Sequence, residues 1–192
     1  MIELVLLCIL SGAGVWLIAV AATRRRRRMR RHPAPTFVFA DLAGYTTLTE
    51  QRGDAVAADV AREFRRTMCA LSREHGAWQV KSMGDGVMIW SPNPAAAIKL
   101  AAKVIEDVGT REDLLPVRVG VHTGPAVMRG CDWYGSSVNV AARLAGEAQP
   151  NEALVSAATR TAARGELTGG LGGQRDLVLR GLDQPIATWR LA

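Results

Sequence analysis

Two aspartates in this 192-residue chain each stand at the end of an apolar run. Asp41 closes "FVFAD", and Asp85 lies in "KSMGDGVMIW". If the fold brings them together, their carboxylates provide the hard oxygen ligands that Mg²⁺ and Mn²⁺ prefer. Two such ions can activate an attacking oxygen and neutralise a leaving one in phosphoryl chemistry. Taken singly, each aspartate is more simply explained as a helix cap or a turn residue, so the prediction depends on the patterns around them.

Gly44 and the pair Asn139 and Arg143 extend this pattern. A glycine three residues after Asp41 would let backbone N–H groups approach phosphates closely. Asn139 and Arg143 are four residues apart in "VNVAAR", so on a helix both side chains project from one face. The fixed fork of an arginine suits a phosphate on which charge accumulates. The alternative is an Asn cap followed by a solvated Arg, but the small apolar neighbours favour a packed helix with two polar exceptions.

Apolar periodicity predicts the elements that must position these residues. A buried strand at 36–42 precedes one long helix at 48–75, in which apolar side chains recur every three or four positions. Two short strands follow, joined by a tight turn around Gly84 and Asp85, and Asp-Gly is a strong hairpin signal. The remaining expected elements are a helix at 91–108, a strand at 115–124, a helix at 137–148, a strand and helix within 153–163, and a hairpin at 175–191.

The order of these elements predicts the fold class. It reads β-α-β-β-α-β with additions, which is typical of an α+β protein. We therefore expect a ferredoxin-like βαββαβ core with extra C-terminal strands and a helix, preceded by one transmembrane helix. We also expect the helices to cover one face of the sheet.

The N-terminal residues predict a membrane anchor. Residues 4–22 are uncharged and almost wholly apolar, which is long enough to cross a bilayer as a helix. A buried core helix is disfavoured because such helices rarely lack a polar face. Seven arginines follow within 24–31, and charge after the apolar run argues against a cleaved signal peptide and marks the cytoplasmic side. We expect a single-pass protein of the cell membrane with a transmembrane helix at 1–23, a basic linker at 24–35 and a cytoplasmic domain at 36–192.

The net charge of +6 belongs to this basic linker. Without the seven arginines of Arg24–Arg31, 17 basic residues face 18 acidic ones. The arginine run predicts contacts with anionic lipid, and the near-neutral remainder does not support binding to nucleic acid. Cys8, Cys69 and Cys131 are far apart and match neither a disulfide framework nor a zinc spacing.

Four stretches in a fixed order carry a family resemblance. They resemble the class III nucleotidyl cyclases, the adenylate and guanylate cyclase catalytic domain, from about Thr36 to the C-terminus. The stretches are "FADLAGYTTLTE", "KSMGDGVMIW", "VRVGVHTG" and "CDWYGSSVNVAARL". One such motif would be weak support, whereas four in order are specific.

The resemblance implies a role for each matching residue. Asp41 and Asp85 match the two metal-binding aspartates, and the backbone carbonyl of Leu42 is expected to contribute to a site for two divalent ions, Mg²⁺ or Mn²⁺. Lys81 and Asp132 match the residues that read the purine. An ammonium donates and a carboxylate accepts, which complements adenine and opposes guanine, so ATP is the expected substrate.

The same resemblance implies that Asn139 orients the ribose and Arg143 stabilises the reacting phosphate, while Arg180 falls at the position of a basic residue on the terminal phosphates. In the family, two subunits share each active site, and this chain carries both sets of residues, so we expect a homodimer. The implied activity is conversion of ATP to 3′,5′-cyclic AMP and pyrophosphate. Three alternatives are a guanylate or relaxed-specificity cyclase, a non-catalytic cyclase-like nucleotide-binding or dimerisation module, and RNA binding, which the charge and the absence of a sheet-aromatic motif disfavour.

Overall fold

The computed structural model describes residues 34–163, 170–182 and 184–191. All of them belong to one compact unit, Ala34–Ala192. The predicted transmembrane helix at 1–23 and most of the basic linker lie outside the described residues. Within the described residues, the helices are too short or too polar to cross a bilayer.

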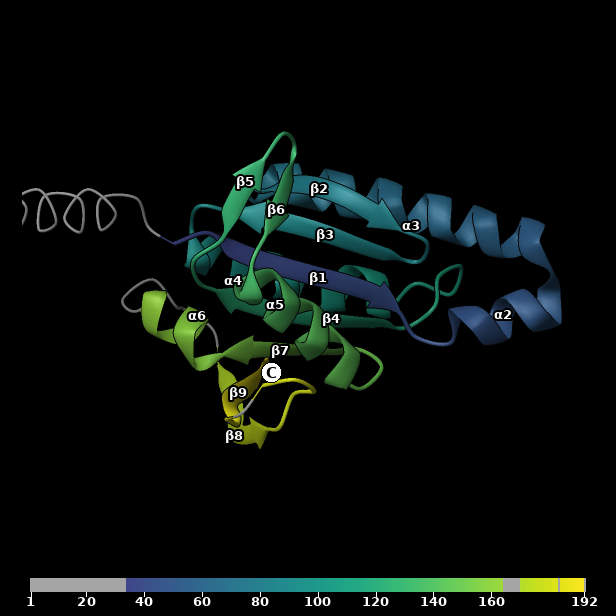
Figure 1. The fold of residues 1–192 in the computed structure, drawn as a ribbon. Helices are drawn as coiled ribbons and strands as arrows, with labels where there is room; N and C mark the ends of the chain where they lie inside the picture. Colours follow the sequence, from purple (N-terminus) through teal and green to yellow (C-terminus); the bar gives the residue numbers. More distant parts are fainter. Residues whose placement is uncertain (1–33, 164–169, 183, 192) are drawn as a thin grey trace, which may run out of the picture. The chain divides into compact units, whose positions relative to one another are not determined.

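Seven of the described strands form one mixed sheet in the order β2-β3-β1-β4-β7-β9-β8 (Figure 1). β1 lies between β3 and β4 and is antiparallel to both, whereas β4 and β7 are parallel. β9 is antiparallel to β7 and to β8. The strands are β1 (Thr36–Leu42), β2 (Trp78–Met83), β3 (Gly86–Ser91), β4 (Val117–Thr123), β7 (Glu152–Ser156), β8 (Leu171–Leu177) and β9 (Ile186–Leu191).

The helices complete the predicted βαββαβ core. In chain order this core is β1-α3-β2-β3-α4-β4, and its sheet order β2-β3-β1-β4 confirms the ferredoxin-like expectation. The predicted C-terminal strand, helix and hairpin are present as β7, α6 and the pair β8–β9. The helices are α2 (Tyr45–Arg52), α3 (Asp54–Glu74), α4 (Pro94–Gly109), α5 (Ser136–Glu147) and α6 (Ala157–Ala162).

The single long helix expected at 48–75 is wrong. Two helices, α2 and α3, meet at Gly53, whose φ of 81° and ψ of 164° interrupt the helical backbone. A residue with a side chain adopts this left-handed φ only with strain, so glycine permits the break. The apolar spacing used for the prediction reflects which side chains of α3 are buried, among them Phe64, Met68 and Leu71. It does not indicate whether the helical backbone is continuous.

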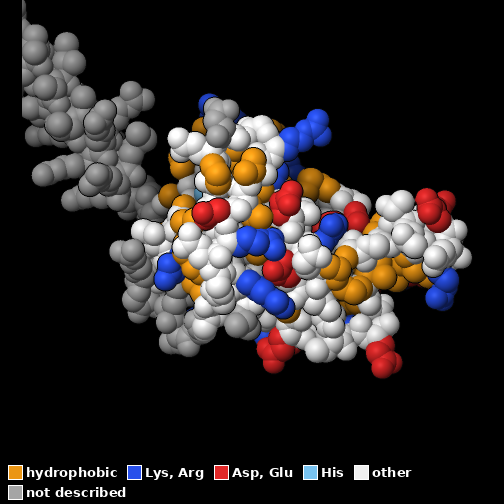
Figure 2. All heavy atoms as spheres, turned by 90° about the horizontal axis from the view of Figure 1, so that it is seen from below, with side chains coloured by type: hydrophobic (Ala, Val, Ile, Leu, Met, Phe, Trp, Pro, Cys, Tyr) orange, Lys and Arg blue, Asp and Glu red, His pale blue; other side chains and the backbone are white. Residues whose placement is uncertain are grey.

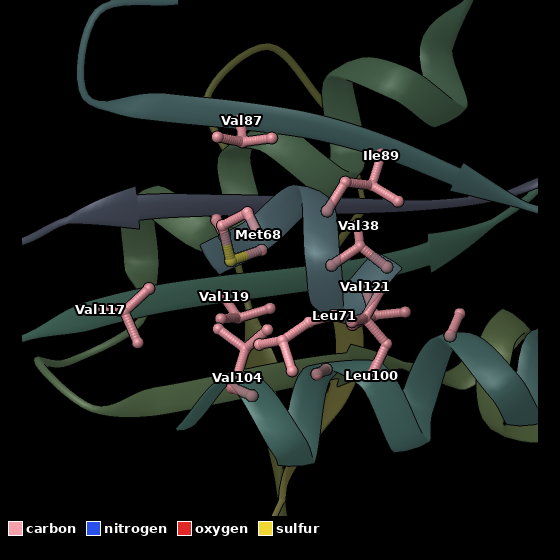
Figure 3. Packing of buried hydrophobic residues seen from close by; sticks show 14 of the residues in the cluster. Val38, Met68, Leu71, Val87, Ile89, Leu100, Val104, Val117, Val119 and Val121 are labelled. Atoms are coloured by element: carbon pink, nitrogen blue, oxygen red, sulfur yellow. The ribbon is translucent and has the colours of Figure 1, made fainter. Parts of the chain in front are cut away.

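The expectation that helices cover one face of the sheet is also wrong. Val38 and Ala40 of β1 pack in the larger core with α3 and α4, part of which Figure 3 shows. Phe37 and Phe39 point to the opposite face and pack against Val138 and other residues of α5. β1 is buried on both faces because its apolar run is continuous and not alternating, which is the pattern of a strand between two layers.

Gly120 of β4 lets α5 approach the sheet closely. A Cβ at this position would lie 2.3 Å from the carbonyl oxygen of Ala141 and 2.3 Å from the backbone nitrogen of Ala145. The backbone of α5 therefore lies directly against β4. This contact fixes the position of α5 on the sheet and therefore the positions of Asn139 and Arg143, which both lie on this helix.

A small hairpin between β4 and α5 stands apart from the main sheet. Its strands β5 (Val127–Arg129) and β6 (Asp132–Tyr134) pair only with each other among the described residues and lie beside β2 (Figure 1). The sequence analysis assigned no strands here, because three-residue strands are too short to show a periodic pattern.

Candidate active site

The structure brings the two predicted metal ligands together. Asp41 is the cross-strand partner of Gly86, and Asp85 is the residue before Gly86 in the turn that joins β2 to β3. Asp41 Oδ1 lies 3.6 Å from the position that a Cβ on Gly86 would occupy. Burial raises the pKa of Asp41 above its ordinary value, and the negative charge of Asp85 raises it further. Such an effect requires the two carboxylates to be neighbours.

The turn that carries Asp85 differs by one residue from the expected one. Met83 pairs with Gly86, so the two turn residues are Gly84 and Asp85, and the positive φ of 63° falls on Gly84. The turn is therefore Gly-Asp and not Asp-Gly. A glycine at the first central position is the preference of a type II′ hairpin turn.

Arg118 is a site residue that the sequence analysis missed. It is the cross-strand partner of Asp41 on β4, and its Nη2 donates a hydrogen bond to Asp41 Oδ2 within an ion pair. This guanidinium opposes the rise in the pKa of Asp41. Arg118 Nε is buried and has no hydrogen-bond partner among the described residues.

The side chains present fit a pair of small divalent cations. Asp41 and Asp85 offer carboxylate oxygens, and Mg²⁺ is usually held by one or two carboxylates together with water and substrate phosphates. The described residues contain no group of three or more His, Cys, Asp or Glu side chains arranged for a metal. Leu42 has a buried side chain, so only its backbone carbonyl could take part. Its role stays a prediction.

Gly44 begins α2 with a left-handed φ of 84°. No side chain caps this helix, and Gly44 itself is exposed. The first N–H groups of α2, from Tyr45 onward, therefore lie four or more residues after Asp41 without a side-chain acceptor. This arrangement is compatible with the predicted approach of phosphate oxygens, which no contact in the structure tests.

The two predicted purine-reading residues are in contact although they are 51 positions apart. Lys81 Nζ donates to Asp132 Oδ2 at 2.6 Å, and the backbone nitrogen of Trp133 donates to Asp132 Oδ1 at 2.8 Å. The hydrogen bond from Lys81 lowers the pKa of Asp132. One chain thus presents a cationic donor and an anionic acceptor side by side.

A cavity of about 380 Å³ lies next to several of the predicted site residues. Asp41, Lys81 and Asn139 all line it, so a predicted metal ligand, a purine reader and the ribose residue surround one hollow. Its volume falls in the range of small-molecule sites. The remaining lining residues are Phe39, Ala40, Met83, Gly86, Val138, Ala142, Ala145 and Gly146.

Arg143 is one turn after Asn139 on α5 and lies beside the loop that carries Arg180. Arg143 does not line the cavity, and its Nη2 lies 3.5 Å from the position that a Cβ on Gly181 would occupy. Arg180 precedes Gly181 and is exposed. Neither guanidinium has a hydrogen bond or ion pair with another described residue. Arg143 thus lies against the residue that follows Arg180, and neither arginine lines the cavity that contains Asp41.

One face of the molecule carries charges of both signs. Figure 2 shows acidic and basic side chains next to one another, between apolar areas, on the face seen from below Figure 1. This pattern agrees with the near balance of 17 basic and 18 acidic residues once the arginine run is set aside.

A ferredoxin-like core with two neighbouring carboxylates at the end of β1 and a lysine–aspartate pair whose lysine lines the cavity defines a nucleotidyl cyclase domain. The family model described as the adenylate and guanylate cyclase catalytic domain matches residues 28–189. The chain therefore belongs to this family, as its four motifs predicted.

Curated relatives include adenylate cyclases. A pH-sensitive adenylate cyclase of Mycobacterium tuberculosis is 38% identical over 130 residues, which cover 66% of this chain and 32% of the relative. An adenylate cyclase of Streptomyces griseus is 32% identical over 124 residues, covering 65% of this chain and 31% of the relative. The chain thus spans about a third of the length of these two relatives.

Solved structures share the fold. An adenylate cyclase from Trypanosoma brucei, analysed in its monomeric state, superposes with a TM-score of 0.76 at 22% identity, covering 83% of this chain and 89% of that one. At this identity the likeness concerns the fold alone.

Proposed function

We propose that this protein is an adenylate cyclase that converts ATP to 3′,5′-cyclic AMP and pyrophosphate at active sites shared by two copies of the chain. The contact of 2.6 Å between Lys81 and Asp132 carries the proposal. The printed names of two relatives, both adenylate cyclases, support it.

The Lys81–Asp132 pair favours adenine for a chemical reason. Adenine offers a donor at its exocyclic amine and an acceptor at the neighbouring ring nitrogen, and guanine reverses both. Lys81 can only donate and Asp132, as a carboxylate, can only accept. Guanine would leave polar groups unpaired in the cavity, at a cost of about 1–3 kcal/mol for each contact.

The remaining residues suit the reaction at the α-phosphate. The ribose 3′-oxygen attacks the α-phosphorus and loses its proton, while the bond to the bridging oxygen breaks and pyrophosphate leaves. Divalent cations held by Asp41 and Asp85 would lower the charge cost of this displacement. Asn139 would orient the ribose from the cavity wall. Arg143 and Arg180, which have no anionic partner among the described residues, would bind the phosphate oxygens.

The position of Arg143 favours a shared site. In its own chain it lies by Gly181 and does not line the cavity that contains Asp41 and Lys81. An extended nucleotide held by the carboxylates of one chain could meet Arg143 and the purine pair of a second chain. In a closed two-fold dimer this arrangement would occur twice.

We further propose that residues 4–22 anchor the protein in the cell membrane, with Arg24–Arg31 on anionic lipid and the catalytic domain in the cytoplasm. The apolar length and the arginines that follow it support this orientation. Protease digestion of inside-out and right-side-out vesicles tests it, because only the inside-out vesicles should lose the domain.

Two assays on the full chain test the activity and the shared site. Purified protein with Mn²⁺ should form the cyclic product from ATP and far less from GTP. Product from GTP at a similar rate favours a relaxed-specificity cyclase, and nucleotide binding without product favours a non-catalytic module.

The second assay mixes two inactive variants, Asp41→Ala and Arg143→Ala. Each alone should lack turnover, and an equimolar mixture should recover up to about a quarter of wild-type activity on statistical grounds, since about half of the dimers are heterodimers and each of these has one intact site of two. Heterodimers that form without recovered activity would exclude the shared site.

A further inference from the structure

The hairpin β5–β6 holds Asp132 in place although it is too small to be stable alone. Each strand has three residues, and the two strands pair only with each other among the described residues. An isolated two-stranded hairpin is at best marginally stable in water. Yet its first β6 residue, Asp132, lies 2.6 Å from Lys81 of β2. Other contacts must hold the hairpin to the sheet.

Four aromatic rings provide these contacts. Trp133, the residue after Asp132, packs edge-on against Phe37 with ring centroids 5.6 Å apart, and against Trp90 at 5.3 Å. Trp90 in turn stacks on Trp78 at 4.9 Å, with the ring planes 19° apart. We name Phe37, Trp78, Trp90 and Trp133 the aromatic cluster. It links β6 to three adjacent strands of the main sheet.

The register of the sheet explains why these rings meet. Trp90 of β3 is the cross-strand partner of Phe37 on one side and of Trp78 on the other, so all three rings lie on the same face. The ring of Trp133 packs against two rings of this row, those of Phe37 and Trp90. Lys81 is three residues after Trp78, and in a regular strand it would point to the opposite face.

A bulge in β2 brings Lys81 onto the face of the aromatic cluster. The pairing of β2 with β3 shifts between Gln79 and Lys81, so that Lys81 is the partner of Met88. Met88 packs with Phe37 on the α5 side of the sheet. The extra residue, Val80, packs against the same group. The bulge thus places Trp78 and Lys81 on one face, where the hairpin can meet both.

We propose that Trp90 and Trp133 are positioning residues for purine selectivity. They hold the hairpin so that Asp132 contacts Lys81, and the donor and acceptor then present one fixed pattern to the base edge. The proposal rests on the adenylate cyclase function proposed above. A purely structural role would predict equal losses of ATP and GTP turnover, whereas a positioning role predicts a change in their ratio.

The first test measures the Lys81–Asp132 contact without any nucleotide. Acylation of Lys81 in the full chain is followed by mass spectrometry, because pairing with Asp132 shields the amine. Asp132→Asn sets the upper limit of reactivity. Trp133→Leu should raise the acylation rate of Lys81 at least threefold toward that limit, and Trp133→Phe should stay near wild type. An unchanged rate in a folded Trp133→Leu variant would overturn the proposal.

The second test measures kcat/KM for ATP and GTP in the same variants. Trp133→Leu and Trp90→Leu should lower the ATP-to-GTP ratio at least tenfold, chiefly through a higher KM for ATP. If either leucine variant does not fold, Trp90→Met and Trp133→Met give the same comparison with smaller changes. Higher Lys81 reactivity with an unchanged ratio in folded variants would refute the role in selectivity.

Trp189→Leu is the matched control. Trp189 lies on β9 and packs under the guanidinium of Arg160, 4.5 Å from the ring centroid, and outside the aromatic cluster. This variant should change neither Lys81 reactivity nor the nucleotide ratio. If wild-type protein turns over neither nucleotide but Trp133→Leu still exposes Lys81, the proposed function fails and the positioning role of Trp133 stands.

Discussion

Arg118 of β4 forms an ion pair with Asp41 of β1, its direct partner across the two strands. Asp85 lies on the other side of Asp41, so the Asp41 carboxylate stands between a guanidinium and a second carboxylate. In the absence of metal, Arg118 is therefore the cation that stabilises this part of the sheet. Metal ions at the same carboxylates would take over part of that role.

Replacing Arg118 should make the folded state depend on metal. In Arg118→Met, the partly buried carboxylate of Asp41 would lose its cation beside the negative charge of Asp85, and we expect unfolding in EDTA to become easier by about 1–2 kcal/mol. Mn²⁺ should raise the melting temperature of this variant more than that of the wild type. Thermal unfolding with EDTA and with Mn²⁺ measures both effects.

Arg62→Met is the control for this experiment. Arg62 pairs with Asp59 on the exposed face of α3, and exposed pairs contribute little. It should unfold like the wild type in both solutions. Equal responses to Mn²⁺ in Arg118→Met and wild type would contradict the assigned role of Arg118.

Gly120→Ala should destabilise the protein and displace α5. The new methyl group would lie 2.3 Å from backbone atoms of Ala141 and Ala145, which cannot move without shifting the helix. We expect a loss of about 2–4 kcal/mol in the free energy of unfolding, measured by urea denaturation.

Gly146→Ala provides the comparison. Gly146 is a residue of α5 itself, and a Cβ at this position would have no other atom within 4 Å. An added methyl group near the end of the helix should be neutral or stabilise by up to about 1 kcal/mol. Similar losses in both variants would show that close packing at Gly120 is not the cause.

His122 should make the folded state sensitive to acid. Burial lowers the pKa of His122 to about 4, and its Nδ1 lies 2.9 Å from Ser156 Oγ. A depressed histidine pKa means that the unfolded chain binds the proton more readily. The contribution to stability is complete above pH 6.5 and is lost as the pH falls from 6.5 towards 4, by about 2 kcal/mol between pH 7 and pH 5.

Denaturation midpoints from pH 7 to pH 5 measure this dependence. His122→Gln removes the titrating group and should flatten the profile over this interval. A profile as steep in His122→Gln as in wild type would assign the acid sensitivity to other groups.

Lys81→Met should reduce the preference for ATP. A charge-assisted hydrogen bond contributes about 1.5–3 kcal/mol, so kcat/KM for ATP should fall about 10- to 150-fold while that for GTP changes much less. Initial rates with each nucleotide give both numbers. Arg129→Met, an exposed change on β5 of the same hairpin, should leave the ratio as it is. Equal losses for both nucleotides in Lys81→Met would argue against base recognition.

Local patterns predicted much of this fold, and long-range pairing determined what they missed. The apolar spacing predicted the βαββαβ core, and the resemblance of two motifs to the cyclase family implied that Asp41 and Asp85 meet. Arg118 escaped notice because its importance comes from its register opposite Asp41, which no local pattern records. The one signal was a permanent charge inside the otherwise apolar run "VRVGV".

The break at Gly53 and the position of α5 were missed for related reasons. Glycine permits many conformations, so it does not indicate by itself that a helix stops there. The continuous burial of β1 was visible as an unbroken apolar run, but which helix would cover its second face depends on the chain returning more than ninety residues later, at α5.

The central place of β1 also affects how the chain folds as it is synthesised. Asp41 leaves the ribosome 77 residues ahead of Arg118, so the strand that bears it must wait for β4 before both of its edges are paired. Pairings this distant along the chain form slowly, and an open strand edge invites aggregation in the meantime. Slower translation or chaperone binding before residue 118 should therefore influence the yield of this protein more than changes near its C-terminus.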